Sequence, residues 1–393
     1  MSALPALEPN DLAEMTALRH DFHRHPEIGM DTARTADIVE AKLREWGVDR
    51  IERFTANGIS AEIRGNRPGV MVGLRADTDA LPVPDRSGAE WTSCTAGRNH
   101  ACGHDGHTAG LLACARWFTK NRDFPGSVVL IFQPGEEGYS GAKHMMEAGL
   151  FDTFPVKEVY AFHGAATHPV GSITLYDGAM SAATDVFTVK VHGKGGHGAR
   201  PNLSTDAIVA ASELVCAFQT VVSRNMDPMR SAVLSVCSIH AGNPGAPTVI
   251  PSDVEIIGTV RAMHAGDQDM IERRMNEICE GMSKVGGVEV KLDYKRVYPV
   301  LVNSHEQYEA LTPKFRELLG EANVDTVTPG NMGGEDFAFM LQKIPGLYIR
   351  VGLADDTHQA PLHNEAFDFN DRALPVAAGI LITCAKERLE ALA

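Results

Sequence analysis

Strand-like apolar runs alternate with helical segments through much of this 393-residue chain. The runs Val70–Arg75, Ser127–Phe132 and Glu158–Phe162 are nearly continuous in apolar residues, as in strands that are buried on both faces. Helical segments between such runs predict an α/β fold with a mixed, largely parallel sheet flanked by helices. Ligands bind outside the carboxyl ends of the strands in such sheets, so the residues that follow each run are the first candidates for a functional site.

Side chains capable of chemistry follow all three runs. Asp77 and Asp79 come after the first run, Glu136 and Glu137 after the second, and His163 directly after the third. Independent surface residues would not be expected to gather at one edge of a sheet. The pattern therefore predicts a single polar site there.

The segment His100–His107 lies between a strand-like run and an apolar helical run and holds one thiol, three imidazoles and a carboxylate. Thiolate and imidazole are the ligands that borderline-soft divalent metals prefer. Cys102 and His104 are two residues apart and can point the same way from extended backbone. The simple alternative is a set of surface histidines beside a buried cysteine. His107 falls in the first helical turn and is expected to be structural or to support a ligand, and His100 stays undecided.

More ligands are available from other segments. Glu137 and His163 arrive from neighbouring strand ends, and either His358 or His363 could complete the set. The adjacent Glu136 and Glu137 cannot face the same atom, so we expect one to bind metal and the other to hold a water as general base. A bridging thiolate with these ligands suits one metal or two. The chemistry implied is metal-assisted hydrolysis.

The order of elements changes near residue 185. The expected elements from there are strands over 185–192, 232–240, 254–263 and 288–294 and helices over 205–223 and 268–285. This β-α-β-β-α-β order predicts a ferredoxin-like α+β unit. Because the chain is too long for one ordinary core, we expect residues 1–183 and 298–393 to form one domain, with 184–297 inserted into it.

Composition narrows the partners and the compartment. A formal charge of −15 argues against nucleic acid and anionic membranes as partners. No apolar stretch approaches the roughly 20 residues that span a bilayer, and no secretory leader is visible. Seven cysteines are scattered without a spaced framework, as in a reducing compartment. We therefore expect a cytoplasmic protein that acts on a small molecule.

A glycine-rich segment offers a remote alternative. Gly193–Gly198 satisfies G-x-G-x-x-G and follows a strand, as in NAD-binding oxidoreductases. However, Pro201 delays the next helix, and Glu213 lies within that helix where the fingerprint needs an acidic residue at a strand end. A non-catalytic binder on a hydrolase scaffold is a further alternative, which nothing in the sequence favours.

Several motifs together resemble one family of metallohydrolases, which includes aminoacylases, hippurate hydrolases, bacterial glutamate-releasing carboxypeptidases and plant auxin-conjugate hydrolases. The matching stretches are Leu74–Pro82, His100–His107, Gln133–Glu137, Gly193–Pro201, Gly333–Phe337 and Pro361–Asn364. They run in order across nearly the whole chain and are most similar to the cysteine-containing branch of N-acyl amino acid amidohydrolases. The resemblance implies cleavage of hippurate-like substrates to a carboxylic acid and a free amino acid. A di- or carboxypeptidase, or another small-amide hydrolase of this family, is the alternative.

The resemblance also implies roles for individual residues. The implied metal ligands are Cys102, His104, Glu137, His163 and His363. Glu136 would be the general base, and Asp79 would orient a ligand or tune the base. The implied cofactor is a divalent metal, one or two per subunit, drawn from zinc, manganese, nickel and cobalt.

For the inserted domain, the resemblance implies a dimerisation and lid role, so we expect a homodimer or a dimer of dimers. His197 would reach the partner subunit's site and stabilise the tetrahedral oxyanion. Arg261 would hold the substrate carboxylate by a two-pronged contact, and Thr248 and Gly333 would also contact substrate. The rest of the chain would then form the catalytic domain.

Three positions depart from patterns in the family. Its di-zinc members carry histidine where this chain has Asp77 and aspartate where it has Cys102. Relatives usually carry asparagine where this chain has Thr248, and threonine is shorter and lacks the amide. These departures leave open the metal and the preference at the substrate's carboxyl end.

Overall fold

The computed structural model describes residues 4–393, so the first three residues of the expected 1–183 segment lie outside it. The chain divides into two compact units. The first takes in the chain up to Met180, Val302–Pro329 and Asp336–Ala393, and the second takes in Ser181–Leu301 and Gly330–Glu335. The second unit thus begins and ends within a few residues of the expected 184–297 segment and also includes a short stretch after residue 329.

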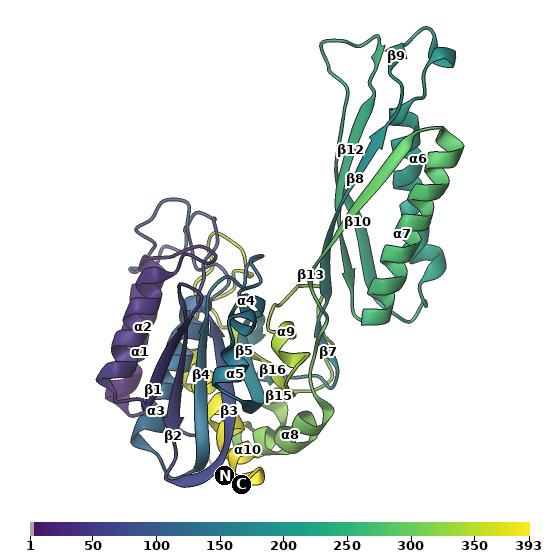
Figure 1. The fold of residues 1–393 in the computed structure, drawn as a ribbon. Helices are drawn as coiled ribbons and strands as arrows, with labels where there is room; N and C mark the ends of the chain where they lie inside the picture. Colours follow the sequence, from purple (N-terminus) through teal and green to yellow (C-terminus); the bar gives the residue numbers. More distant parts are fainter. Residues whose placement is uncertain (1–3) are drawn as a thin grey trace. The chain divides into compact units, whose positions relative to one another are not determined.

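An eight-stranded mixed sheet forms the centre of the first unit, in the order β1-β2-β4-β3-β5-β16-β6-β15 (Figure 1). Its strands are β1 (Arg50–Phe54), β2 (Gly58–Arg64), β3 (Arg67–Asp77), β4 (Pro125–Gln133), β5 (Val156–Pro169), β6 (Ile173–Thr174), β15 (Val324–Asp325) and β16 (Gly346–Ala354). The neighbours β4, β3, β5 and β16 run parallel to one another. The predicted largely parallel sheet is therefore confirmed.

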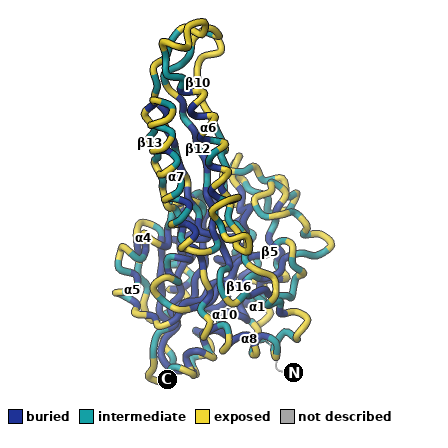
Figure 2. The backbone as a smooth tube through the Cα atoms, turned by 90° about the vertical axis from the view of Figure 1, so that its right-hand side faces the viewer, coloured by how far each residue is buried: buried dark blue, intermediate teal, exposed yellow. Residues whose placement is uncertain are grey.

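Helices flank this sheet. They are α1 (Pro9–Arg24), α2 (Ala33–Glu45), α3 (His104–Lys120), α4 (Gly141–Glu147), α5 (Leu150–Thr153), α8 (His305–Leu319), α9 (Ala338–Leu341) and α10 (Leu374–Ala391), with 3-10 turns at Glu321–Asn323 and Asp371–Ala373. Helices α3 and α10 pack on β3 and on each other, and α1 packs on α3. Figure 2 shows the buried backbone running along β16 and α10. The core of the unit lies between these helices and the parallel strands.

A buried ion pair fixes α10 to β5. Arg388 donates to both carboxylate oxygens of Glu158, at 2.6 to 3.1 Å. Tyr160 and Gln307 also donate to Glu158, at 2.6 and 2.9 Å. Burial by itself raises the pKa of Glu158, but the hydrogen bonds from these three residues hold that pKa below its usual value.

The second unit is a four-stranded antiparallel sheet with two helices side by side on it (Figure 1). Its elements are β8 (Ala183–His192), α6 (Ala207–Thr220), β10 (Ala232–Ala241), β12 (Asp253–Ala262), α7 (Ala265–Gly286) and β13 (Glu289–Tyr298). The strand order β10-β12-β8-β13 is that of the predicted ferredoxin-like unit. Its smaller elements are β9 (Gly196–His197), a 3-10 turn (Pro201–Leu203), a π-helical turn (Val221–Asn225) and β11 (Val249–Ile250). The short strands β7 (Ala179–Ser181) and β14 (Leu301–Val302) pair with each other and include the residues at which the chain passes from one unit to the other.

One helical segment is more apolar than the sequence led us to expect, since no stretch was expected to be long and apolar enough to span a bilayer. Within the described chain, the helical stretch Ala207–Asn225 is long and apolar enough to cross a bilayer by length and composition, and it is the only such stretch. Its inner residues Ala211, Leu214 and Phe218 are fully buried in the core of the second unit. One face of the segment therefore packs into the core of the second unit, while Ile208 and Val209 on it are exposed.

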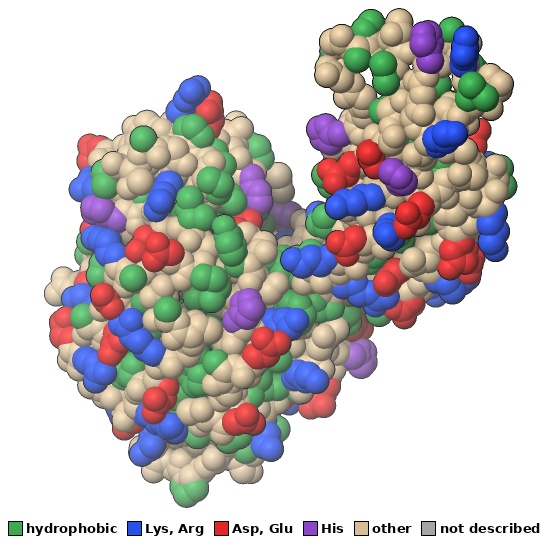
Figure 3. All heavy atoms as spheres, turned by 45° about the horizontal axis from the view of Figure 1, so that its top comes forward, with side chains coloured by type: hydrophobic (Ala, Val, Ile, Leu, Met, Phe, Trp, Pro, Cys, Tyr) green, Lys and Arg blue, Asp and Glu red, His purple; other side chains and the backbone are tan. Residues whose placement is uncertain are grey.

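The charged surface is mixed in sign despite the net charge. On the face drawn in Figure 3, acidic and basic side chains are interspersed on each unit, and neither sign gathers into a large patch. Nucleic-acid-binding surfaces instead concentrate lysine and arginine on one face.

We predict that Arg388→Met destabilises the protein by about 3–5 kcal/mol, because it leaves the Glu158 carboxylate buried without its cation. Urea unfolding at neutral pH measures this loss. The pKa of Glu158 is lower in the folded protein than in the unfolded chain. The ionised carboxylate therefore stabilises the fold fully above the unfolded pKa of about 4, and this stabilisation is lost as the pH falls below that value. The difference between the variant and the parent should shrink over the same range.

Arg67→Met is the matched control for that experiment. Arg67 pairs with Glu390 of the same helix α10, but both side chains are about half exposed, and exposed pairs contribute little. Equal losses in the two variants would contradict the role given to the buried pair.

Candidate metal centre

Three parallel strands bring the candidate residues level with one another. Asp77 at the end of β3 is in register with Gln133 at the end of β4. Arg75 is in register with Ala161 of β5, so His163 lies level with Asp77 two residues further on. Helix α3 begins at His104, directly after Gly103 with its left-handed φ of 86°. The strand ends and the helix start thus meet at one edge of the sheet, as parallel packing requires.

The five expected metal ligands form two triads that share Cys102. One triad is Cys102, His104 and His163, the other is Cys102, Glu137 and His363, and the ligand atoms of each lie within 4.8 Å of one another. Cys102 Sγ is 3.4 Å from His163 Nε2, and His363 Nε2 is 3.2 Å from Glu137 Oε1. Ligands about 2.0–2.3 Å from a tetrahedral ion lie roughly 3.5 Å apart. All five residues belong to the first unit.

His104 supplies a direct test of whether a metal fits. The side chain is fully buried, and its ring nitrogens make only long contacts, 3.5 Å from Nδ1 to Asp79 Oδ1 and 3.8 Å from Nε2 to Asp77 Oδ2, without a well-formed hydrogen bond among the described residues. Such unpartnered buried groups are rare in folded proteins. Burial opposes a charge on this ring, but Asp77 and Asp79 outweigh it and raise the pKa of His104 to about 10. The surroundings of the ring therefore favour positive charge, which a metal ion would also provide.

His163 is held in the orientation that a ligand needs. Its Nδ1–H donates to Gly164 O at 2.8 Å, which leaves the Nε2 lone pair facing Cys102. Burial and the nearby His107 hold the pKa of His163 well below its usual value, so the ring is neutral. A backbone carbonyl on the second ring nitrogen is a common way to orient a metal-binding histidine.

His107 braces this arrangement. Its Nε2 accepts the Gly164 N–H at 2.9 Å, so the proton is on Nδ1, which lies 2.6 Å from Asp77 Oδ1. Both ring nitrogens are therefore occupied, which agrees with the expectation of a structural or supporting role. His100 is also buried, burial lowers its pKa to about 3, and it belongs to neither triad.

Asp79 holds the segment that carries the two glutamates. Its carboxylate oxygens accept the backbone N–H groups of Glu136 and Glu137 at 2.9 and 3.1 Å. The backbone turns here, with Gly138 N–H donating to Glu136 O at 2.7 Å. Both carboxylates consequently lie within 4.8 Å of a ring nitrogen of His104. The expectation that adjacent glutamates diverge did not anticipate this turn.

Cys102 lies among these acidic groups. Burial raises the pKa of its thiol well above the usual value, and the carboxylates of Glu137 and Glu136 raise it further. A thiolate at this position therefore needs a cation beside it, because its charge is otherwise opposed by both burial and its neighbours.

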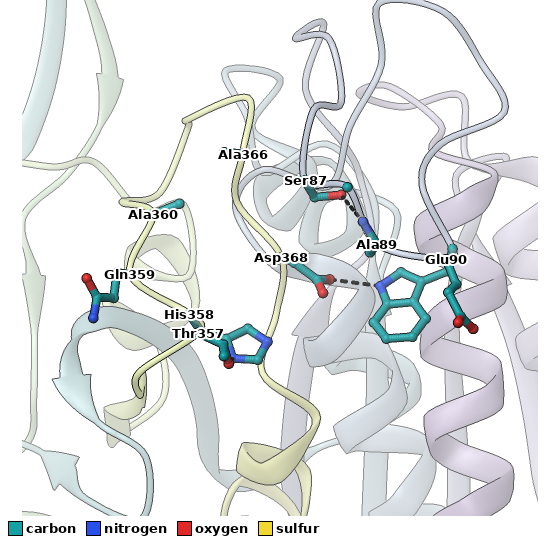
Figure 4. A pocket seen from close by; sticks show the side chains of 11 residues that line it. Ser87, Ala89, Glu90, Thr357, His358, Gln359, Ala360, Ala366 and Asp368 are labelled. Carbon is teal, nitrogen blue, oxygen red and sulfur yellow. Dashed lines mark hydrogen bonds between the residues drawn. The ribbon is translucent and has the colours of Figure 1, made fainter.

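The structure distinguishes the two C-terminal histidines that spacing left open. His363 faces Glu137 from a loop in which its own φ is 64° and its N–H donates to Ala101 O at 2.7 Å. His358 instead turns to Asp355, with 2.9 Å between Nδ1 and Oδ1. It lines a cavity of about 560 Å³ walled by the loops 87–91 and 357–368 (Figure 4). His358 therefore belongs to neither triad.

The residues predicted for substrate contact all lie in the second unit. His197 on β9 is in register with Val249 of β11, and Gly198 N–H donates to Thr248 O at 2.8 Å, so His197 and Thr248 are neighbours. Gly333 accepts the Ala182 N–H at 2.9 Å.

Arg261 lies near the far end of β12 in the four-stranded sheet, whereas His197 belongs to the separate two-stranded sheet of β9 and β11. β12 begins at Asp253, beside His192 and the segment leading to β9. Arg261 is eight residues further along that strand, which corresponds to roughly 27 Å. No single small molecule could therefore touch both Arg261 and His197 of one chain.

Arg261 also lacks an anionic partner within the described chain. It is half-buried and donates only to neutral oxygens, those of Thr259 Oγ1 and Val260 O. Burial lowers the pKa of its guanidinium. A half-buried arginine with only neutral acceptors is suited to bind an incoming carboxylate.

The glycine-rich segment does not lead into a helix. Gly196 and His197 form β9, and α6 begins only at Ala207. Its first amides are capped by Asp206, which accepts from Ile208 N and Val209 N. The arrangement that a dinucleotide requires, with the last glycine at a helix start, is therefore not formed.

Sequence reasoning missed several charged residues around the centre. Arg75 is fully buried and lies 2.8 Å from Asp77 and 2.9 Å from Asp336, and Arg19 and His23 are fully buried in α1. An arginine within an apolar strand run was a signal for the first. Arg19 and His23 are four residues apart and so share one face of α1, which was a signal for these two residues.

Comparison with known proteins agrees with this geometry. The chain is 36% identical over 365 residues to a hippurate hydrolase of Campylobacter jejuni, covering 93% of this chain and 94% of that one. It is 34% identical over 393 residues to an IAA-amino acid hydrolase of Arabidopsis thaliana, covering 98% and 87%. The structure of Bacillus subtilis YXEP, a dinuclear metal binding peptidase of the M20 family, superposes with a TM-score of 0.83 at 28% identity, covering 98% and 99%.

The family model of peptidase family M20/M25/M40 matches residues 73–387, which include all five residues of the two triads. The chain therefore belongs to peptidase family M20/M25/M40, and it is a metal-dependent hydrolase that acts on linear amides.

Proposed function

We propose that this protein hydrolyses N-acyl amino acids of the hippurate type, releasing a carboxylic acid and a free amino acid, at a centre that holds two divalent ions. The two triads sharing Cys102 are the observation that carries the proposal, because they offer two adjacent sets of mixed sulfur, nitrogen and oxygen ligands. The names of the two relatives, a hippurate hydrolase and an IAA-amino acid hydrolase, support this substrate class.

The residues that would hold the ions are Cys102, His104, Glu137, His163 and His363, and Cys102 belongs to both triads. Sulfur, imidazole and carboxylate together suit zinc, manganese, nickel or cobalt. When bound, such ions act as Lewis acids toward the amide carbonyl and lower the pKa of water. His163 presents an unprotonated Nε2 toward Cys102. His104 would present one once the ion displaces its proton.

Glu136 would be the general base. Its carboxylate lies within 4.8 Å of ligand atoms of His104 and Glu137, so it can take a proton from a water attacking the amide carbon. It would then deliver that proton to the leaving nitrogen as the carbon–nitrogen bond breaks. Asp79 keeps the carboxylate in place through the backbone N–H groups of Glu136 and Glu137.

Substrate recognition would come from the second unit. Arg261 would bind the substrate carboxylate, and Gly333 and Thr248 would contact the rest of the molecule. His197 would stabilise the oxyanion of the tetrahedral intermediate. Arg261 is roughly 27 Å along β12 from Asp253, and His197 lies on β9, which pairs with β11 ahead of that end of the strand. The two residues would therefore have to come from different subunits, which supports a homodimer.

Two features support a cytoplasmic location. The seven cysteines are all free, as expected where thiols stay reduced. Among the described residues, the single helical stretch apolar enough to cross a bilayer places one face in the core of the second unit.

The two triads predict different metal losses. Cys102→Ala should lose both ions because Cys102 is in both triads, whereas His163→Ala should weaken only one. Elemental analysis of the purified variants measures ions per subunit. Cys94→Ala, which removes an exposed thiol outside the triads, is the matched control, and retention of two ions by Cys102→Ala would refute the shared ligand.

Replacing the general base should separate metal binding from turnover. Glu136→Gln is expected to keep the parental metal content but to lower kcat by about 10²- to 10⁴-fold with hippurate, because the amide cannot accept the proton. Glu147→Gln, an exposed glutamate on α4, should behave as the parent. Parental turnover in Glu136→Gln would show that another group is the base.

A mixed dimer tests whether His197 acts in the partner's site. Glu136→Gln and His197→Ala are each expected to be nearly inactive alone. After subunits of the two variants are mixed and re-associated, a mixed dimer would contain one intact site, so about a quarter of parental activity should return. If both residues served the same chain, mixing would restore nothing.

A further inference from the structure

Two buried cationic side chains face inward from α1, one helical turn apart. Arg19 and His23 are both fully buried, and α1 packs on α3 along this face. Buried charges are retained in proteins chiefly where they are paired. Their partners are carboxylates from three segments that are far apart in the sequence.

The His23 ring lies between two of these carboxylates. Nδ1 is 2.8 Å from Asp105 Oδ2, and Nε2 is 3.2 Å from Asp85 Oδ2. Burial opposes the charge, but Asp105 and Asp85 outweigh it and raise the pKa of His23 to about 9. At neutral pH the ring is therefore an imidazolium, whose Nδ1–H donates to Asp105 and whose Nε2 makes an ion-pair contact with Asp85.

Asp105 connects His23 to the first triad. It directly follows His104 at the start of α3, and its side chain is fully buried. Fixing the Asp105 carboxylate therefore fixes the first turn of the helix that carries His104. Arg19 also helps to hold the Asp105 carboxylate, because its Nη1 lies 3.5 Å from Asp105 Oδ2.

Asp85 connects His23 to the second triad. The next residue, Arg86, donates its N–H to Glu365 O at 2.6 Å, and its guanidinium lies 3.1 Å from the Glu365 carboxylate. Glu365 is two residues from His363. The Asp85 carboxylate also accepts the N–H groups of Ser87 and Ser93, at 2.9 and 2.7 Å. A shift of Asp85 would therefore also move the backbone around Arg86, which is bonded to the loop that carries His363.

Arg19 provides a parallel connection to the same loop. Its Nη1 is 2.6 Å from Asp368, which lies five residues after His363. The Trp91 indole N–H donates to the same Asp368 oxygen at 3.0 Å, a contact drawn in Figure 4. The helix start with His104 and the loop with His363 are thus tied to α1 from both sides.

We propose that His23 is a positioning residue that sets the spacing between the two triads, by holding Asp105 next to His104 and Asp85 next to the segment that anchors His363. The inference rests on the proposed function, because it takes the two triads as the metal centre. It assigns to α1 a part in metal binding although His23 is a ligand in neither triad.

Metal titration of the His23→Gln variant tests the proposal. A glutamine carries no positive charge to hold the Asp85 and Asp105 carboxylates, so the spacing should relax. Residues that support ligands typically change metal affinity by about 10- to 100-fold, and we expect a weakening of this size by calorimetry on the metal-free protein. The rise in Tm that metal produces should shrink as well.

His20→Gln is the matched control. His20 lies on the same helix and contacts Asp371 at 2.7 Å, but it is a quarter exposed and contacts neither Asp85 nor Asp105. Its replacement should leave metal affinity at the parental value. A loss as large as that in His23→Gln would show that any change in α1 weakens the centre, and would overturn the proposal.

Asp85→Asn provides a second variant if His23→Gln does not fold. It leaves the contact between His23 and Asp105 in place, so only the ion of the Cys102, Glu137 and His363 triad should bind more weakly. The titration should then show one parental and one weakened step.

Each contrary outcome has a distinct meaning. Equal falls in Tm for the metal-free and metal-loaded forms, with parental affinities for both ions, would reduce His23 to a structural residue and overturn the inference. Failure of the parent protein to bind divalent ions would instead refute the proposed function.

Discussion

Negative groups crowd one buried edge of the central sheet, and the rest of the structure is arranged to hold them there. Asp77, Asp79, Glu136 and Glu137 lie around a single imidazole, with the Cys102 thiol beside them. Like charges at such distances in a low dielectric repel strongly. The raised pKa values of His104 and of Cys102 both report this field. A site with this many acidic groups favours cations. An anionic substrate group would have to be bound by residues outside this cluster.

The rigidity of the edge comes from layers of support behind the ligands. Asp79 holds the glutamate turn by its backbone. His107 joins Asp77 to the backbone beside His163, and Arg75 neutralises Asp77 from within the sheet. All of these contacts are buried except the part-buried one from Glu137 N–H to Asp79, so water cannot replace the buried ones at low cost. The ligands themselves are therefore free to meet the ions with few hydrogen bonds of their own.

Much of the fold and the centre followed from local patterns. The strand runs, the β-α-β-β-α-β order and the polar residues after each strand predicted the sheet, the ferredoxin-like unit and the clustering of the candidate ligands. These features have short periods or lie at element ends, where sequence carries most of the information.

What the sequence did not reveal depends on long-range contacts. The role of His23 depends on its contacts with Asp85 and Asp105, which lie 62 and 82 residues away in the sequence. Spacing alone left His358 and His363 equivalent, and only the family resemblance favoured His363, which the fold brings to 3.2 Å from Glu137. The separation of His197 from Arg261 depends on strand register. None of these is encoded in a window of neighbouring residues.

The interrupted path of the chain through the first unit has a consequence for synthesis. β16 pairs with β5 and β6 near the centre of the sheet, yet it is made after the whole continuous stretch of the second unit. During translation the second unit can fold on its own, while β5 presents an open edge that is prone to pairing with other chains. His363 emerges later still, so a nascent chain holds four of the five ligands and only one complete triad. The triad that contains His363 is therefore completed only late in synthesis.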